Sequence, residues 1–446
     1  MRSDLISRPR PLGSGRVQPP AAGSDPGHGV AAAVAPLLTH FFGGSPPVRF
    51  EFWDGTSLGP VGGDTLQVRS PDAVRRLLWS PGEIGLARAF VMGDLGFEGD
   101  IFEMLATLHG ATPERIHVGS RLPWQAMQAA RRLGVVGGPL PPPPEEAAPR
   151  GRLHSRARDA QVVQHHYDVS NEFYAMVLGP AMTYSCARFA PGVETLEAAQ
   201  ESKHDLICHK LGLPERTGLR VLDVGCGWGS FALHAARHYG ARVIGVTLSP
   251  AQAEFARDRV AAAGLERQIE IRLQDYRDVP DGKFDAIASV GMFEHVGSSK
   301  SAQYFATMRR LLEPEGRFLN HAISSVGGSR IGPRTFIGRY VFPDGELIDV
   351  GQVVLGLEEA GFEVRDVESL REHYAKTLRA WVGNLQQHWD AAVAEVGVRR
   401  ARVWLLYMAA SANGFDDGGI SIHQVLGVVP GPGGRSGMPP TRGDWA

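Results

Sequence analysis

The stretch Val221-Leu-Asp-Val-Gly-Cys-Gly-Trp-Gly-Ser230 contains the strongest indication of the fold. Its first four residues are typical of a buried strand, and glycines follow at alternate positions, Gly225, Gly227 and Gly229. This spacing allows the backbone to turn sharply after a strand and to approach a ligand closely. A helical pattern follows at residues 230–239. Such a unit is compatible with NAD, FAD, a nucleotide or S-adenosylmethionine.

Strand-like segments alternate with helical patterns around this loop. The expected strands are residues 219–224, 241–246, 269–273, 284–290 and 316–323, and helical patterns include residues 251–263 and 301–312. Strands that alternate with helices predict an α/β fold with a parallel, doubly wound, Rossmann-like sheet. The ligand of such a sheet binds at the carboxyl ends of its strands. Asp223 stands there, where a carboxylate can orient the loop or meet a ligand amine.

The ends of the next two strands favour one ligand. A dinucleotide site usually has an acidic residue about 20 residues past the glycines for the ribose hydroxyls. Here the second strand ends in Gly245-Val-Thr-Leu-Ser249, with Gln252 one turn later, and these side chains can bind ribose without a carboxylate. The third strand ends in Leu273-Gln-Asp-Tyr276, a polar cluster suited to an adenine ring. This pattern favours S-adenosylmethionine and a class I methyltransferase.

The composition predicts a chain of two domains that does not span a membrane. Its 446 residues exceed one typical domain, and no apolar run approaches the roughly 20 residues that span a bilayer. A net charge of −2 gives no general attraction to nucleic acid. Three scattered cysteines fit neither a disulfide framework nor a zinc site, so we expect a cytoplasmic protein without a bound metal.

Changes in composition along the chain indicate the domain boundaries. Residues 1–28 are expected to form a disordered leader without the layout of a secretory signal. Residues 29–136 are expected to form a small α+β domain associated with lipid or the membrane, with strands at 48–53 and 65–69 and helices that begin near Pro71 and Ile101. We expect a Pro-rich linker at 137–160, the methyltransferase domain at 161–428 and a disordered tail at 429–446.

Basic residues gather around the linker. Two interpretations stay open: a solvated face, or a patch that meets anionic lipid headgroups, where each cation contributes about 1 kcal/mol near the surface. The residues are Arg121, Arg131, Arg132, Arg150, Arg152, Arg156 and Arg158.

Further motifs point to a family. They are His166-Tyr-Asp-Val-Ser-Asn171, Thr183-Tyr-Ser-Cys-Ala187, Thr247-Leu-Ser-Pro-Ala-Gln252, Asp275-Tyr-Arg-Asp278, Gly291-Met-Phe-Glu-His-Val-Gly297, Arg339-Tyr-Val-Phe-Pro343 and His373-Tyr-Ala-Lys-Thr-Leu378, with Trp381. In this order, together with the glycine loop, they resemble the cyclopropane-fatty-acyl-phospholipid synthase family, which includes the mycolic acid cyclopropane synthases. The resemblance covers residues 162–426, and the segment from Gly93 to Asp100 resembles, more loosely, the N-terminal domain of longer bacterial members.

The resemblance implies transfer of a methyl group from S-adenosylmethionine to the cis double bond of an acyl chain, usually in a membrane phospholipid. An alkene is a poor nucleophile, so the reaction depends on holding it in line with the sulfonium methyl. Attack leaves a carbocation, and loss of a proton from the added methyl group closes a cyclopropane ring. The implied partners are unsaturated phospholipid acyl chains at the inner membrane face, where the protein is peripheral, and a second copy in a homodimer.

The resemblance also assigns the site residues. The base is thought to be a bound bicarbonate, held by residues that correspond to Cys186, Glu294, His321 and Tyr374, with the backbone near Ile323. The expected cofactor-binding residues are Tyr184, Ser185, Asp223, Gly225, Gly227, Gly229, Thr247, Leu248, Ser249, Gln252, Gln274, Asp275 and Tyr276.

Two departures leave the product open. Asn320-His-Ala-Ile323 stands where relatives usually have Leu-His-Thr-Ile, and Ile348 replaces a common proline. The same site chemistry gives a methylene- or methyl-branched chain if the cation loses a different proton. Two further functions also stay open, a small-molecule N-methyltransferase and a lipid-binding module without activity.

Overall fold

The computed structural model describes residues 29–111, 122–147, 151, 158, 169–280, 282–328, 332 and 335–444. The chain divides into two compact units: unit 1 comprises Met1–Glu146 and Gly397–Asn413, and unit 2 comprises Ala147–Val396 and Gly414–Ala446. The predicted leader lies outside the described residues. So do the start of the His166 motif and four of the basic residues near the linker, namely Arg121, Arg150, Arg152 and Arg156.

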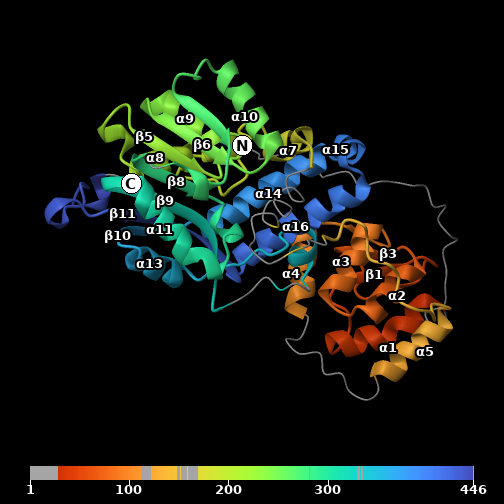
Figure 1. Ribbon diagram of the computed structural model, residues 1–446. Coiled ribbons are helices and arrows are strands. Elements are labelled where there is room, and N and C mark those ends of the chain that lie inside the picture. Colours follow the sequence, from red (N-terminus) through yellow and green to blue (C-terminus); the bar gives the residue numbers. More distant parts are fainter. Residues whose placement is uncertain are drawn as a thin grey trace, which may run out of the picture. The chain divides into compact units, whose positions relative to one another are not determined.

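Unit 2 is built on a seven-stranded sheet with the order β10-β11-β9-β8-β5-β6-β7 (Figure 1). Neighbouring strands from β9 to β7 pair in parallel, which confirms the predicted Rossmann-like fold. The strands are β5 (Arg220–Val224), β6 (Arg242–Thr247), β7 (Ile269–Leu273), β8 (Phe284–Val290), β9 (Leu312–Ser325), β10 (Glu363–Ser369) and β11 (Ile420–Val428).

Two strands at one edge are additions to the predicted sheet. β11 pairs antiparallel with both β9 and β10. The sequence Glu363-Val-Arg-Asp-Val-Glu-Ser369 of β10 carries charged residues on an edge strand, so it lacks the apolar run that marks the buried parallel strands. The charges of β10 explain why the sequence pattern does not indicate that strand; β11 is mostly buried and apolar, and its omission has no such explanation.

Helices cover both faces of this sheet. Side chains alternate along β5, so Val221 packs with helices α8 (Leu196–Lys210), α9 (Ser230–Tyr239) and α10 (Pro250–Ala262). Leu222 faces the opposite layer, which α11 (Ser301–Leu311) and α13 (Val350–Glu359) supply. Asp223 therefore shares the face of Val221, toward the α8 layer. The other helices of unit 2 are α7 (Asn171–Leu178), α12 (Phe336–Tyr340), α14 (Arg371–Gln387) and α15 (Trp389–Val396).

Unit 1 combines a small sheet with helices, as the sequence predicts for the N-terminal region. The strand order is β2-β1-β3-β4, and β1 and β3 are parallel. Its strands are β1 (Arg49–Phe52), β2 (Ser57–Leu58), β3 (Thr65–Val68) and β4 (Leu95–Glu98), and its helices are α1 (Val30–Phe42), α2 (Pro71–Trp79), α3 (Glu83–Met92), α4 (Ile101–Ala111) and α5 (Leu122–Arg132).

The boundary of unit 1 differs from the predicted one because distant residues pack on it. Most of helix α16 (Val398–Asp416) belongs to unit 1, where Asn413 Nδ2 donates to the Phe102 carbonyl at 2.8 Å. The first part of the predicted linker also lies on this unit. Trp79 Nε1 donates to the Gly137 carbonyl at 2.8 Å, and Arg88 pairs with Glu146 at 2.6 Å. Local composition contains no information on such long-range contacts.

The residues after β11 differ from the predicted disordered tail. Val429 exchanges backbone hydrogen bonds with Glu315 and Gly316, which extends the pairing beyond the strand. Arg442 contacts the buried carboxylate of Asp366 at 3.0 Å, so the tail supplies a counter-charge to the sheet. No helix in the described part of the chain is long and apolar enough to cross a membrane.

Candidate active site

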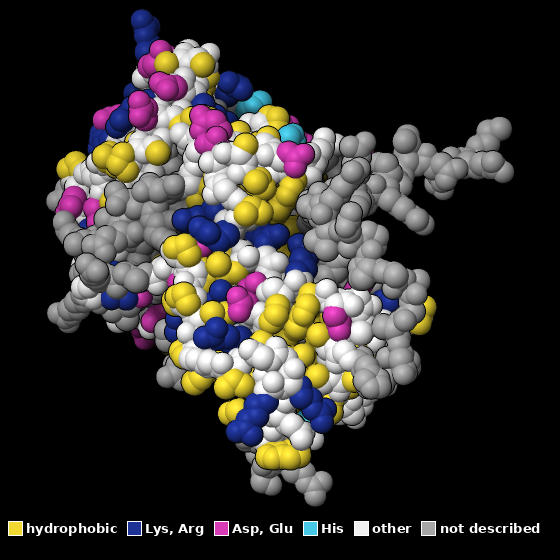
Figure 2. Space-filling model, turned by 90° about the vertical axis from the view of Figure 1, so that its right-hand side faces the viewer, with side chains coloured by type: hydrophobic (Ala, Val, Ile, Leu, Met, Phe, Trp, Pro, Cys, Tyr) yellow, Lys and Arg dark blue, Asp and Glu magenta, His cyan; other side chains and the backbone are white. Residues whose placement is uncertain are grey.

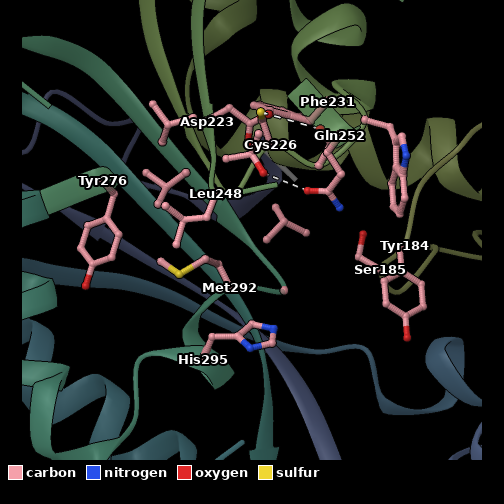
Figure 3. A pocket seen from close by; sticks show the side chains of 18 of the residues that line it. Tyr184, Ser185, Asp223, Cys226, Phe231, Leu248, Gln252, Tyr276, Met292 and His295 are labelled. Carbon is pink, nitrogen blue, oxygen red and sulfur yellow. Dashed lines mark hydrogen bonds between the residues drawn. The ribbon is translucent and has the colours of Figure 1, made fainter. Parts of the chain in front are cut away.

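A cavity opens at the carboxyl ends of β5, β6 and β8, as expected for this fold. In Figure 3, Tyr184 and Ser185 lie on one side and Tyr276 on the other, with Met292 and His295 between them. Most of the predicted cofactor residues line it, namely Tyr184, Ser185, Asp223, Gly225, Gly227, Thr247, Leu248, Gln252, Gln274 and Tyr276.

The glycine loop makes a cradle in this cavity. Gly225 has φ 77° and Gly227 has φ 52°, a region that favours glycine. The N–H groups of Gly225 and Cys226 both donate to the Val246 carbonyl, at 2.9 and 3.0 Å, so β6 holds the turn. A Cβ on Gly225 would lie 2.9 Å from Met292 Cγ, whereas one on Gly227 would meet no atom within 4 Å. Gly227 thus leaves open space that a ligand can occupy.

The three remaining predicted cofactor residues do not line the cavity. Ser249 accepts the Gln252 N–H at 3.3 Å and so caps α10, as serine does at many helix starts. Asp275 pairs with Arg277 at 2.6 Å. The Cβ position of Gly229 is 3.2 Å from Ala256, so this glycine allows α9 and α10 to approach. These residues shape the site through their neighbours.

Gln252 is oriented by Thr247. Thr247 Oγ1 donates to Gln252 Oε1 at 2.9 Å and also accepts the Ser249 N–H at 3.2 Å. The amide oxygen of Gln252 is therefore engaged within the protein. Its NH₂ group stays available as a donor to a ligand in the cavity that Gln252 lines.

Helix α8 fixes the Tyr184–Ser185 segment through buried polar contacts. Gln200 Nε2 donates to the Ser185 carbonyl and Lys203 Nζ donates to Ser185 Oγ, both at 2.9 Å. Burial lowers the pKa of Lys203 to about 7. Burial also raises the pKa of Asp223 to about 7, against the opposing influence of Lys203. A basic and an acidic side chain, each of which can be charged or neutral near pH 7, therefore line the same cavity.

Two of the predicted catalytic residues, Glu294 and His321, are each buried with a polar partner at one atom of the side chain. The Ile323 N–H donates to Glu294 Oε1 at 2.7 Å, and burial raises the pKa of Glu294 to about 7. His321 Nδ1 lies 3.2 Å from Gln424 Nε2, and burial lowers the pKa of this imidazole. Glu294 Oε2 and His321 Nε2 are both buried without a hydrogen-bond partner among the described residues.

The other two, Cys186 and Tyr374, lie in packed surroundings. Cys186 is fully buried, and its thiol donates to the Ala187 carbonyl at 3.2 Å, while burial raises its pKa. The Tyr374 ring lies 4.7 Å from that of Phe415. None of the four predicted catalytic residues is among those that line the cavity. The structure thus brings together the cofactor residues but not the complete predicted catalytic group.

Sequence reasoning missed several residues of the cavity wall. Lys203, Trp228, Met292 and His295 all line it, and burial lowers the pKa of His295 to about 4. A signal for Lys203 was available. It lies on the buried face of α8 four residues after Ala199, where helical spacing predicts an apolar side chain. A lysine at such a position indicates a specific electrostatic task.

Comparison with known proteins identifies the family. The family described as mycolic acid cyclopropane synthetase matches residues 154–425. The chain belongs to this family. It is accordingly an S-adenosylmethionine-dependent methyltransferase, as the motifs predict, and the cavity at the glycine loop is its candidate cofactor site.

Two relatives of known name match most of the chain. The chain is 43% identical over 416 residues to the probable fatty acid methyltransferase Rv3720 of Mycobacterium tuberculosis. The alignment covers 89% of this chain and 94% of the relative. The chain is 35% identical over 361 residues to the cyclopropane-fatty-acyl-phospholipid synthase of Escherichia coli, with 81% and 87% covered.

Solved structures of the family support the fold of unit 2. The mycolic acid cyclopropane synthase CmaA1, complexed with SAH and CTAB, is 34% identical, with a TM-score of 0.57 over 60% of this chain and 98% of that one. Coclaurine N-methyltransferase reaches a TM-score of 0.53 at 20% identity, which shows a shared fold alone.

Proposed function

We propose that this family member transfers the methyl group of S-adenosylmethionine to the cis double bond of a phospholipid acyl chain and forms a cyclopropane ring. The observation that carries the proposal is that Glu294 Oε2 and His321 Nε2 are each buried without a hydrogen-bond partner among the described residues. A buried polar atom without a partner is costly, so it commonly marks a functional group or a missing ligand. Here the atoms belong to residues that the family motifs associate with proton removal.

The same atoms fit the bicarbonate that the family resemblance implies. Bicarbonate is an oxyanion with one O–H group. An imidazole N–H can donate a hydrogen bond to it, and a carboxyl oxygen can donate or accept one according to its protonation state. The pKa of Glu294 near 7 allows either protonation state at neutral pH. A bicarbonate ion within reach of both side chains would supply a base for the proton of the added methyl group. Glu294 and His321 would hold and orient it.

A branched product is the second candidate. It is favoured by the names of two relatives, since Rv3720 and a Pseudomonas putida protein that is 40% identical are both described as probable fatty acid methyltransferases. The departures from the motifs do not decide the matter. Asn320 Oδ1 accepts the Tyr304 hydroxyl at 3.3 Å, and Ile348 is buried in the core. Neither residue lines the cavity.

We also propose that unit 1 attaches the protein to the inner face of the membrane from the cytoplasm. Helix α5 exposes Trp124 and Met127, at 63% and 49% of their surface, and Arg131 follows on the same helical face. Figure 2 shows hydrophobic side chains beside Lys and Arg at its lower end, the level at which Figure 1 draws α1 and α5. Tryptophan and arginine on one face suit the interface of an anionic bilayer.

The function is tested by incubating the full chain and labelled S-adenosylmethionine with vesicles of cis-unsaturated phospholipid, or with free amines. We expect label in acyl chains that gain one CH₂ and resist mild hydrogenation. A product of equal mass that takes up hydrogen would instead be a methylene-branched chain. Label found in amines only would overturn the lipid proposal.

A further inference from the structure

Lys203 places a buried amine at the cofactor cavity with no carboxylate in contact in the described part of the chain. Its side chain has 0% exposure, yet it lines the cavity. Nζ donates to the neutral hydroxyl of Ser185 at 2.9 Å. Among the described residues, no carboxylate lies within ion-pair distance of this ammonium group. Burying an uncompensated ammonium is costly, and burial accordingly lowers the pKa of Lys203 to about 7; a ligand carboxylate at this place would favour the charged form.

Lys210 shows what a compensated lysine on the same helix looks like. It lies seven residues later on the same face of α8 and is equally buried. Its Nζ contacts Asp366 at 2.8 Å and Glu368 at 2.5 Å. Among the described residues, the fold therefore places two carboxylates in contact with Lys210 and none in contact with Lys203. Of these two lysines, Lys203 lines the cavity and Lys210 does not.

Asp223 is the complementary group across this part of the cavity. It lies at the end of β5 on the α8 side of the sheet, and its Oδ2 is buried without a partner among the described residues. Asp223 and Lys203 influence each other electrostatically. The other titratable groups that interact electrostatically with Lys203 are Cys186, His204 and His321. Burial keeps the Cys186 thiol and the two imidazoles neutral at pH 7, whereas Asp223, with a pKa of about 7, is the acidic group that can ionise there.

We propose that Lys203 and Asp223 together recognise the amino-acid end of the cofactor, with Lys203 binding its α-carboxylate and Asp223 its α-ammonium group. This part of S-adenosylmethionine is a zwitterion whose charges are opposite to those of the two side chains. Charge-assisted hydrogen bonds of this kind are stronger than neutral ones. The proposal rests on cofactor use and does not depend on the lipid acceptor, so the two can fail separately.

The test compares two ligands, S-adenosylhomocysteine and its decarboxylated analogue, by isothermal titration calorimetry on the full chain. We expect the wild type to bind S-adenosylhomocysteine roughly 10- to 100-fold more tightly, the range for a hydrogen bond to a charged group. Lys203→Met should bind both ligands with nearly equal affinity. Lys210→Met, the matched loss of a buried lysine, should keep the wild-type preference.

Two results would overturn the proposal. One is equal affinity of the wild-type protein for the two ligands, which needs no variant to fold. The other is a Lys203→Met protein that loses the same factor for both ligands, since Lys203 would then serve only to balance Asp223 and hold Ser185.

Proton exchange on binding gives an independent readout. A ligand carboxylate favours charged Lys203, which takes up a proton near pH 7, while a ligand ammonium favours charged Asp223, which releases one. In the wild type the two effects oppose each other. Lys203→Met should leave net proton release, and Asp223→Asn should leave net uptake, measured by calorimetry in buffers of different ionisation enthalpy. Unchanged proton exchange in both variants would contradict the assignment.

Discussion

The backbone N–H of Ile323 donates a 2.7 Å hydrogen bond to Glu294 Oε1, while Glu294 Oε2 has no partner in the described part of the chain. The bond joins the short 3-10 helix η3 (Phe293–His295) after β8 to the end of β9. It holds one oxygen of a buried carboxyl group and leaves the other available for a further contact. A positioned group of this kind is what proton transfer requires.

Replacing Glu294 with Gln tests that role. The amide oxygen can still accept the Ile323 N–H, so the fold and cofactor affinity should be retained. Turnover should fall by about 10²- to 10³-fold, within the range for loss of a group that takes part in proton transfer. Binding of S-adenosylhomocysteine by calorimetry and methyl transfer to unsaturated vesicles measure the two effects.

Glu346→Gln is a suitable control for this variant. Glu346 also accepts a backbone N–H, that of Ser298 at 2.7 Å, and its own N–H donates to the Glu294 carbonyl at 3.2 Å, so it shares the local backbone with Glu294 but is only half-buried and not a predicted site residue. Its replacement should leave turnover near the wild-type value. Normal turnover in Glu294→Gln would show that the carboxylate is structural.

The pH dependence of turnover follows from the raised pKa of Glu294. Burial places this pKa at about 7, so the carboxylate form is scarce at pH 6 and predominates above pH 8. If the carboxylate holds and orients the base, turnover at saturating cofactor rises with pH through about 7. His295, with its pKa lowered to about 4, stays neutral throughout this range. A pH–rate profile measures the rise, and Glu294→Gln should remove it; a rise that survives in the variant belongs to another group.

The cofactor cradle predicts a different result at Gly227. Its positive φ and the open space at its Cβ position mean that Gly227→Val both strains the loop and fills part of the cavity. We expect at least a 100-fold loss of affinity for S-adenosylhomocysteine. Gly240→Val is the control, because Gly240 has φ 67° and open space but terminates α9 away from the cavity. It should show a similar strain of about 1–2 kcal/mol in urea unfolding and normal affinity.

The sequence predicts those parts of the site that depend on local chain geometry. Gly225 and Gly227 act through backbone conformation, and Thr247 and Gln252 lie five residues apart, so a strand-to-helix turn brings them together. Ser249 shows the limit of this reasoning, because a serine at that position serves equally to cap α10. Lys203 and Asp223 come from separate elements whose packing decides their environment. The inclusion of α16 in unit 1 likewise depends on distant contacts, such as Asn413 with Phe102.

Membrane attachment through α5 can be tested separately from catalysis. Trp124→Ser with Met127→Ser removes the exposed apolar side chains, and Arg131→Ala with Arg132→Ala removes two cations worth about 1 kcal/mol each near an anionic surface. Each pair should weaken binding to anionic vesicles by about 10-fold or more in flotation assays. High salt should reduce the effect of the arginine pair, since screening already weakens the wild-type attraction.

Val61→Ser provides the control for this surface. Val61 is 92% exposed on the loop between β2 and β3, so its replacement removes an exposed apolar side chain outside α5. It should leave vesicle binding unchanged. Turnover of a detergent-dispersed substrate should be near normal in all these variants, because α5 does not line the cofactor cavity. Vesicle binding that survives both α5 double substitutions would contradict the proposed attachment, because a bilayer interface should respond to the apolar and the charged pair alike.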